Sequence, residues 1–84
     1  MSVNPINLIP SHTKAARALL EWTAQDLAAK SSVGISTVKV FESGKPVRDS
    51  SKQAIIDAIE NAGVLLYNGG QPGARLMKRN SPNV

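Results

Sequence analysis

Apolar residues recur every three or four positions as far as Ala62, and the spacing changes after it. This periodicity is typical of amphipathic helices that bury one face. We predict four helices: from Ser11 or His12 to Glu21, from about Ala24 to Lys30, from Ile35 or Ser36 to Glu42, and, after a cap at Asp49 or Ser50, to about Asn61. The pattern therefore predicts a mainly α-helical chain.

The expected core is aliphatic, because only 4% of the residues are aromatic. In the first and fourth helices the inward positions are Ala15, Ala16, Leu19, Leu20, Ile55, Ala58, Ile59 and Ala62. Trp22 is expected in the core where the first two helices meet. Since the chain has 84 residues, these positions are expected to share one modest core.

Residues at the helix ends support these limits. Thr23 is placed to cap the second helix, and Asp26, three residues later, adds negative charge to its first turn. Gly44 and Gly63 follow the third and fourth helices, where a left-handed residue ends a helix. Each boundary therefore has a local chemical reason.

The segment after the fourth helix predicts a β-hairpin. Val64–Tyr67 is expected to be one strand, Asn68–Gly73 a loop and Ala74–Met77 the return strand. A two-stranded hairpin is marginal alone, so its edge is a candidate dimerisation element, paired within or between chains. We divide the chain into an N-terminal arm (1–10), a helical domain (11–63), the hairpin (64–79) and a disordered tail (80–84).

Composition excludes some chemistry and leaves other classes open. The absence of cysteine excludes disulfides and thiolate metal sites, and it fits the cytoplasm. The net charge of +4 attracts polyanions weakly, and ordinary solubility explains it equally well. The first ten residues lack a basic start, so we expect no signal peptide. No apolar run has the length of a membrane span, so we expect no membrane contact.

The second and third predicted helices have the spacing of a helix-turn-helix. Leu27 and Ala28 lie on the first of the two, Val33 lies in the turn, and Val38 follows five residues later. Ala28 is small where the helices are expected to cross, and the two valines are expected to fill the space beneath them.

The stretch from Arg17 to Gly44 resembles the XRE family of phage repressor and Cro-type regulators. The matching positions are Leu27 and Ala28, Val33, Ser36 to Val38, and Phe41 to Gly44. The resemblance extends more loosely over residues 12–62 and implies a four-helix lambda-repressor-like DNA-binding domain. Two departures are Ser32, where the family commonly has glycine, and the hairpin, which stands in place of a fifth helix.

The resemblance implies that the third helix enters the major groove of double-stranded DNA. The residues expected to face the groove are Ile35, Ser36, Lys39 and Val40. Ser36 can bond almost any base, Lys39 can donate to guanine, and an apolar side chain can contact a thymine methyl group. The alternative for Ile35 and Val40 is that they extend the core.

Phosphate contacts are expected at helix ends and in the loop after the third helix. The candidates are Thr23, Gln25, Thr37, Lys45 and Arg48. The alternative for Thr23 is that it only caps the second helix. The alternative for Lys45 and Arg48 is that they are solvated surface residues. Arg75, Lys78 and Arg79 could contact flanking DNA or be a solvated basic segment.

Other residues are interpreted as structural. The resemblance implies that Arg17 pairs with Glu42. The single histidine, His12, is expected at the solvated surface, and the glycine-rich loop at 68–73 lacks the Lys-Ser/Thr of a phosphate-binding loop. No nucleophile with converging titratable groups is recognisable, so we expect no enzyme, metal or cofactor.

The favoured hypothesis is a sequence-specific transcriptional regulator, a repressor acting as a homodimer. A single helix reads few base pairs, so specificity normally needs two half-sites. The alternative is a protein-interaction module of the same fold, such as an antitoxin or antiactivator with a protein partner.

Overall fold

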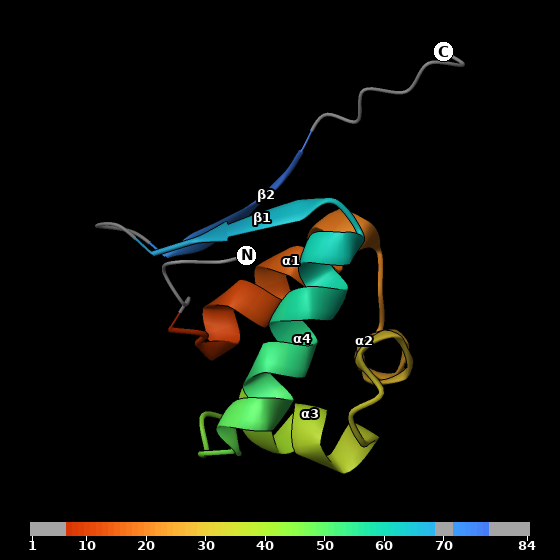
Figure 1. Cartoon of the computed structure of the whole chain (residues 1–84), viewed down its shortest axis with the longest axis vertical. Coiled ribbons are helices and arrows are strands. Elements are labelled where there is room, and N and C mark those ends of the chain that lie inside the picture. The colour runs from red at the N-terminus through yellow and green to blue at the C-terminus, as the bar shows by residue number, and fades with distance from the viewer. Residues whose placement is uncertain (1–6, 69–71, 78–84) are drawn as a thin grey trace.

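Four helices are followed by an antiparallel hairpin in the computed structural model, which describes residues 7–68 and 72–77 (Figure 1). The elements are α1 (Pro10–Leu20), α2 (Ala24–Ser31), α3 (Ile35–Glu42), α4 (Asp49–Asn61), β1 (Val64–Tyr67) and β2 (Gly73–Leu76). The prediction of a mainly helical chain with a hairpin after the fourth helix is confirmed. The predictions for the arm before Asn7, for Lys78 and Arg79, and for the tail 80–84 lie outside the described residues.

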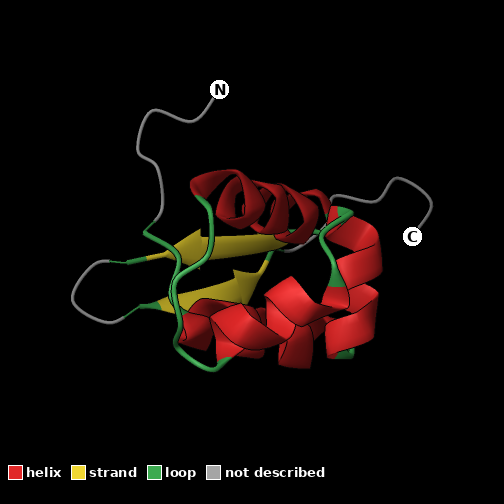
Figure 2. Cartoon of the chain, turned by 90° about the horizontal axis from the view of Figure 1, so that it is seen from below, coloured by secondary structure: helices red, strands yellow, loops and turns green. Residues whose placement is uncertain are grey.

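The hairpin and α3 lie at opposite ends of the molecule (Figure 1). Helices α1 and α4 pack against the hairpin, α1 mainly against β2 and α4 against β1, while α2 contacts α3 and α4. Seen from the α3 end, the two strands lie behind the helices (Figure 2). Helices therefore cover one face of the hairpin, and no described element covers the other.

The core is aliphatic, as predicted, and all four helices and the hairpin contribute to it. Its fully buried side chains include Leu27, Val38, Ile55, Ile59 and Val64. Trp22 packs against this core where α1 meets α2, but only part of it is buried. The Nζ atom of Lys30 lies 5.9 Å from the centroid of the Trp22 ring, which is a cation–π distance.

The predicted inward face of α1 was wrong at Leu19, whose exposed fraction is 41%. The buried residues of α1 are His12, Thr13 and Ala16. Because residues three and four apart share a helix face, this buried face continues to Leu20 and leaves Leu19 at its margin. The periodicity identified the helix, but the position of the hairpin decided which stripe of it is buried.

Three predicted positions hold α2 and α3 together. Val38 is fully buried, Ala28 is buried, and Val33 packs half-buried against the same core. The turn between the helices is three residues long, and the Val33 N–H donates to the Ala28 carbonyl oxygen at 3.1 Å. The outer surface of α3 is left uncovered as a result.

Ser32 ends α2 in the left-handed conformation, with φ of 59° and ψ of 29°. A side chain in this region is strained, and glycine relieves that strain. Gly44 and Gly63 both have φ of 96°, as their predicted stop roles require. For α4 the predicted cap was wrong, because the N-cap is Arg48 and Asp49 is already helical.

Replacing Ser32 with glycine is expected to raise the free energy of unfolding by about 0.5 kcal/mol. The gain is small because glycine also has more freedom in the unfolded chain. Urea unfolding followed by circular dichroism measures it. The control is Ser32→Ala, which keeps a Cβ atom in the strained region and is expected to give no gain. Equal stability of the two variants would contradict the strain at this turn.

His12 is fully buried, so the prediction that it lies at the solvated surface was wrong. Its Nδ1 atom accepts from the Ile9 N–H at 3.1 Å, and its Nε2 atom lies 2.8 Å from the Tyr67 carbonyl oxygen. Since Nδ1 accepts, Nε2 carries the proton and donates to that carbonyl. The imidazole thus joins the start of α1 to the end of β1, a pairing that local sequence could not reveal.

Replacing His12 with leucine is expected to lower the free energy of unfolding by roughly 1.5 kcal/mol, because two backbone groups lose their partner. Chemical denaturation measures the loss, and hydrogen exchange should show it most strongly at the hairpin amides. Lys14→Leu, at an exposed position of the same helix, is the control. Unchanged hairpin protection in the His12 variant would contradict this role.

The two strands pair within one chain, which the sequence left open. Val64 lies opposite Leu76, and Tyr67 lies opposite Gly73. Gly73 belongs to β2 and not to the loop as predicted. A Cβ atom there would lie 2.9 Å from the Tyr67 ring, so glycine allows the ring to cover the strand. Within the described residues, every helix is too short or too polar to span a lipid bilayer.

Candidate nucleic-acid interface

One face of α3 is exposed and carries polar, cationic and apolar groups. Val38 and Phe41 are buried and fix the opposite face against the core. Ser36, Lys39 and Val40 are exposed, and their spacing of three and four residues places them side by side. We call these three residues the α3 face. It offers a hydroxyl group, an ammonium group and an aliphatic surface within about one helical turn.

The other predicted residues of α3 lie elsewhere. Ile35 is half-buried and packs against the core, so the alternative that it extends the core is the one the structure shows. Thr37 is half-buried next to the exposed Ser36. Val40, in contrast, has an exposed fraction of 40% and does not extend the core. The α3 face is therefore smaller than the predicted set.

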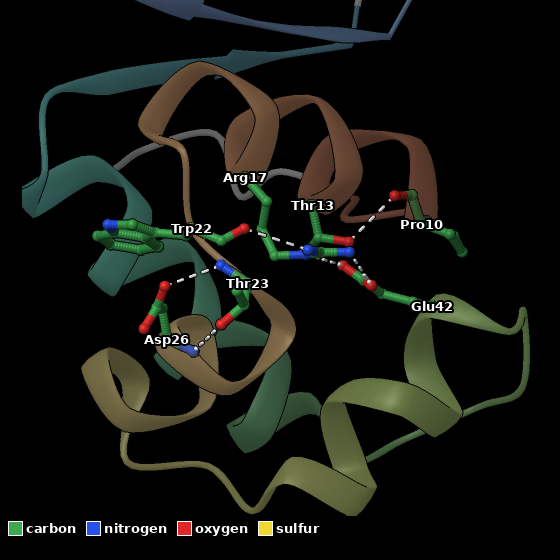
Figure 3. Close-up of polar contacts among 7 residues, drawn as sticks. All are labelled: Pro10, Thr13, Arg17, Trp22, Thr23, Asp26 and Glu42. Carbon is green, nitrogen blue, oxygen red and sulfur yellow. Dashed lines mark hydrogen bonds and ion pairs between the residues drawn. The ribbon is translucent and has the colours of Figure 1, made fainter.

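The N-terminus of α2 is closed by a reciprocal capping box (Figure 3). The Asp26 N–H donates to the Thr23 hydroxyl oxygen at 3.0 Å, and the Thr23 N–H donates to a carboxylate oxygen of Asp26 at 2.8 Å. Capping therefore occupies Thr23, and the Asp26 carboxylate adds negative charge where a phosphate was expected. Gln25 is exposed beside them.

Cations gather where the chain leaves α3. Lys45 lies in the loop after α3, and Arg48 is the residue before α4; both are exposed. Lys52, which the sequence analysis did not single out, lines a hollow of about 270 Å³ together with Lys45. Its signal in the sequence was its position in the first turn of α4, close to this loop.

Arg17 ties three parts of the fold together (Figure 3). Its Nε and Nη2 atoms donate to the two carboxylate oxygens of Glu42 at 3.1 and 2.8 Å. Its Nη1 atom donates to the Trp22 carbonyl oxygen at 3.2 Å, a contact that the sequence did not predict. The guanidinium group thereby links α1 to the end of α3 and to the segment before α2.

This pairing also shapes the charge at the α3 end of the molecule. Across residues 7–68 and 72–77, Arg17 and Glu42 form the only ion pair within 4.0 Å. Within that range, Lys39, Lys45 and Arg48 thus have no carboxylate partner. Since Glu42 is neutralised by Arg17, the exposed charge of α3 comes from Lys39.

In the described part of the chain, no group of three or more histidine or carboxylate side chains could hold a metal ion. No family model matches the sequence, and no curated protein was found to be similar to it. The α3 face and the cations beside it are therefore the features of the molecule that bear on its function.

Proposed function

We propose that this chain is a sequence-specific DNA-binding regulator of the XRE type, with a lambda-repressor-like helix-turn-helix that places α3 in the major groove. The observation that carries the proposal is the α3 face: three exposed side chains on a short helix whose other side is locked into the core. An α-helix of this kind fits the major groove of B-DNA, where base edges are distinguishable.

Each group has a role that its chemistry supports. The Lys39 ammonium donates to guanine O6 or N7, the Ser36 hydroxyl bonds a base edge, and Val40 contacts a thymine methyl group. Lys45 and Arg48 contact phosphates beside the C-terminal end of α3, and Gln25 is a weaker candidate at the start of α2. Thr23 contributes by holding α2 in shape.

The regulator acts as a homodimer and as a repressor in this proposal. One α3 face reads only a few base pairs, and two faces on neighbouring half-sites provide useful specificity. Removing the hairpin after Gly63 would not be a clean test of dimerisation, because Val64 and Leu66 are core residues. Sedimentation of the full chain with and without DNA is the better measurement.

A fluorescence titration against the DNA upstream of the chain's own gene tests the function. With two cations, Lys45 and Arg48, on phosphates, the affinity should fall roughly 12-fold between about 50 and 200 mM salt. An unrelated duplex of equal length is the control and should bind more weakly. Equal affinity for both duplexes, or binding insensitive to salt, would reject the proposal.

A protein partner for the α3 face is the second candidate. It is favoured by one observation, the exposed aliphatic side chain of Val40 beside Lys39. The same titration distinguishes a DNA-binding regulator from a protein-interaction module, because a module that binds only a protein would bind neither duplex.

A further inference from the structure

The outer edge of β2 has no strand partner in the described part of the molecule. The Met77 N–H donates to the Gly63 carbonyl oxygen at 2.8 Å, and the strand register continues from this pair. Hydrogen-bonded and non-hydrogen-bonded pairs alternate in an antiparallel ladder. The backbone N–H and C=O groups of Ala74 and Leu76 therefore point away from β1, and no described residue bonds them.

The two edges of the hairpin differ in access. On β1 the outward-pointing groups belong to Val64 and Leu66, with exposed fractions of 0% and 3%, so that edge is closed. On β2, Ala74 is half-exposed and Leu76 has an exposed fraction of 52%. An open strand edge is a template for another strand.

The surface around the open edge is apolar and basic. Leu65, Tyr67 and Met77 are exposed large hydrophobic residues of the hairpin, and Arg75 is exposed between Ala74 and Leu76. Arg75 is the charged residue of the hairpin within the described residues. A strand that carries carboxylates at alternate positions would complement this charge.

A second copy of this chain fits the same edge poorly. Helix α1 packs mainly against β2. Pairing β2 with the β2 of a second copy would place these two strands about 5 Å apart and would bring the two α1 helices that pack against them close together. Packed helices need about 8–10 Å between their axes. A second copy would also add like charge at Arg75.

We propose that the β2 edge binds an extended acidic segment of another protein as a third strand. The segment's backbone pairs with Ala74 and Leu76, its carboxylates face Arg75, and its alternate apolar side chains lie on the helix side of the sheet. On α1, the helix that packs against β2, Leu19 is an exposed apolar residue. The inference does not depend on DNA binding, because α3 lies at the other end of the molecule (Figure 1).

The test is fluorescence anisotropy of the full chain with a labelled eight-residue peptide that alternates glutamate and valine. The peptide should bind and should protect the Ala74 and Leu76 amides from hydrogen exchange. The same peptide with N-methyl groups on alternate residues, which cannot pair with the edge, should lose at least about tenfold in affinity.

Two charge-reversal variants test whether the acidic peptide binds at Arg75. Arg75→Glu should weaken binding of the acidic peptide by about tenfold or more and favour a peptide with lysine in place of glutamate. Lys39→Glu carries the same charge change at the far end and should leave peptide binding unchanged. A loss of DNA binding in Lys39→Glu with peptide binding intact would show that the two sites fail separately.

Three outcomes would overturn the proposal: no binding of the acidic peptide, equal binding of the N-methylated peptide, or occupation of the edge by a second copy. The last is detectable because the chain has no cysteine. In Leu76→Cys, oxidation would form a disulfide dimer if two β2 edges met at this residue. We expect that variant to form no disulfide-linked dimer under oxidation.

Discussion

Replacing Lys39 with glutamate is expected to lower the affinity for double-stranded DNA by about 100-fold. The substitution removes the only cation of the α3 face and places a carboxylate against base edges and phosphates. Lys39 is exposed and makes no ion pair with a described residue, so the fold should tolerate the change. Fluorescence titration at fixed salt measures the effect.

The matched control is Arg75→Glu, which makes the same charge change on the hairpin. Because the hairpin lies at the end opposite α3, this variant should bind DNA about as tightly as the unchanged chain (Figure 1). Circular dichroism should show that both variants are folded. Equal losses in the two variants would mean that net charge, and not the α3 face, governs binding.

Replacing Arg17 with alanine is expected to lower the free energy of unfolding by about 3 kcal/mol. The exposed fractions of the Arg17 and Glu42 side chains are 24% and 10%, so solvent screens the pair only in part. The substitution leaves the Glu42 carboxylate half-buried without its partner, and it also frees the Trp22 carbonyl oxygen. Urea denaturation of the purified variant measures the loss.

A double-mutant cycle separates the contribution of the Arg17–Glu42 ion pair from that of the hydrogen bond between Arg17 and the Trp22 carbonyl. Glu42→Gln keeps the bond between Arg17 and the Trp22 carbonyl, so it should cost less than Arg17→Ala. The double variant should be more stable than the sum of the single losses implies, by about 1–2 kcal/mol. Additive losses would show that the two side chains do not interact in solution.

Signals from neighbouring residues were sufficient to predict most of the secondary structure. The Thr23 and Asp26 capping box and the glycines at 44 and 63 depend on neighbouring residues only, and each lies where it was predicted. The α2–α3 packing also followed from spacing, because Ala28, Val33 and Val38 can meet only if the two helices cross. In the candidate site, the exposure of Ser36 and Lys39 followed from the same helical period.

Contacts between distant parts of the chain decided the burial of the side chains that the sequence did not predict. His12 is buried where its Nε2 atom meets the carbonyl oxygen of Tyr67, 55 residues later. Leu19 is exposed because a different stripe of α1 packs against the hairpin and the core. Ile35 turned out to pack on the core, which the period of one short helix could not settle.

The amino-acid sequence by itself determined the helices, most of their ends and the polar surface of α3, since these depend on backbone propensity, capping and spacing over a few residues. Only the tertiary structure decided which edge of the hairpin is open, which partner His12 has and how Arg17 joins three segments. These features depend on surfaces brought together by the burial of one shared core, and burial is a property of the whole chain.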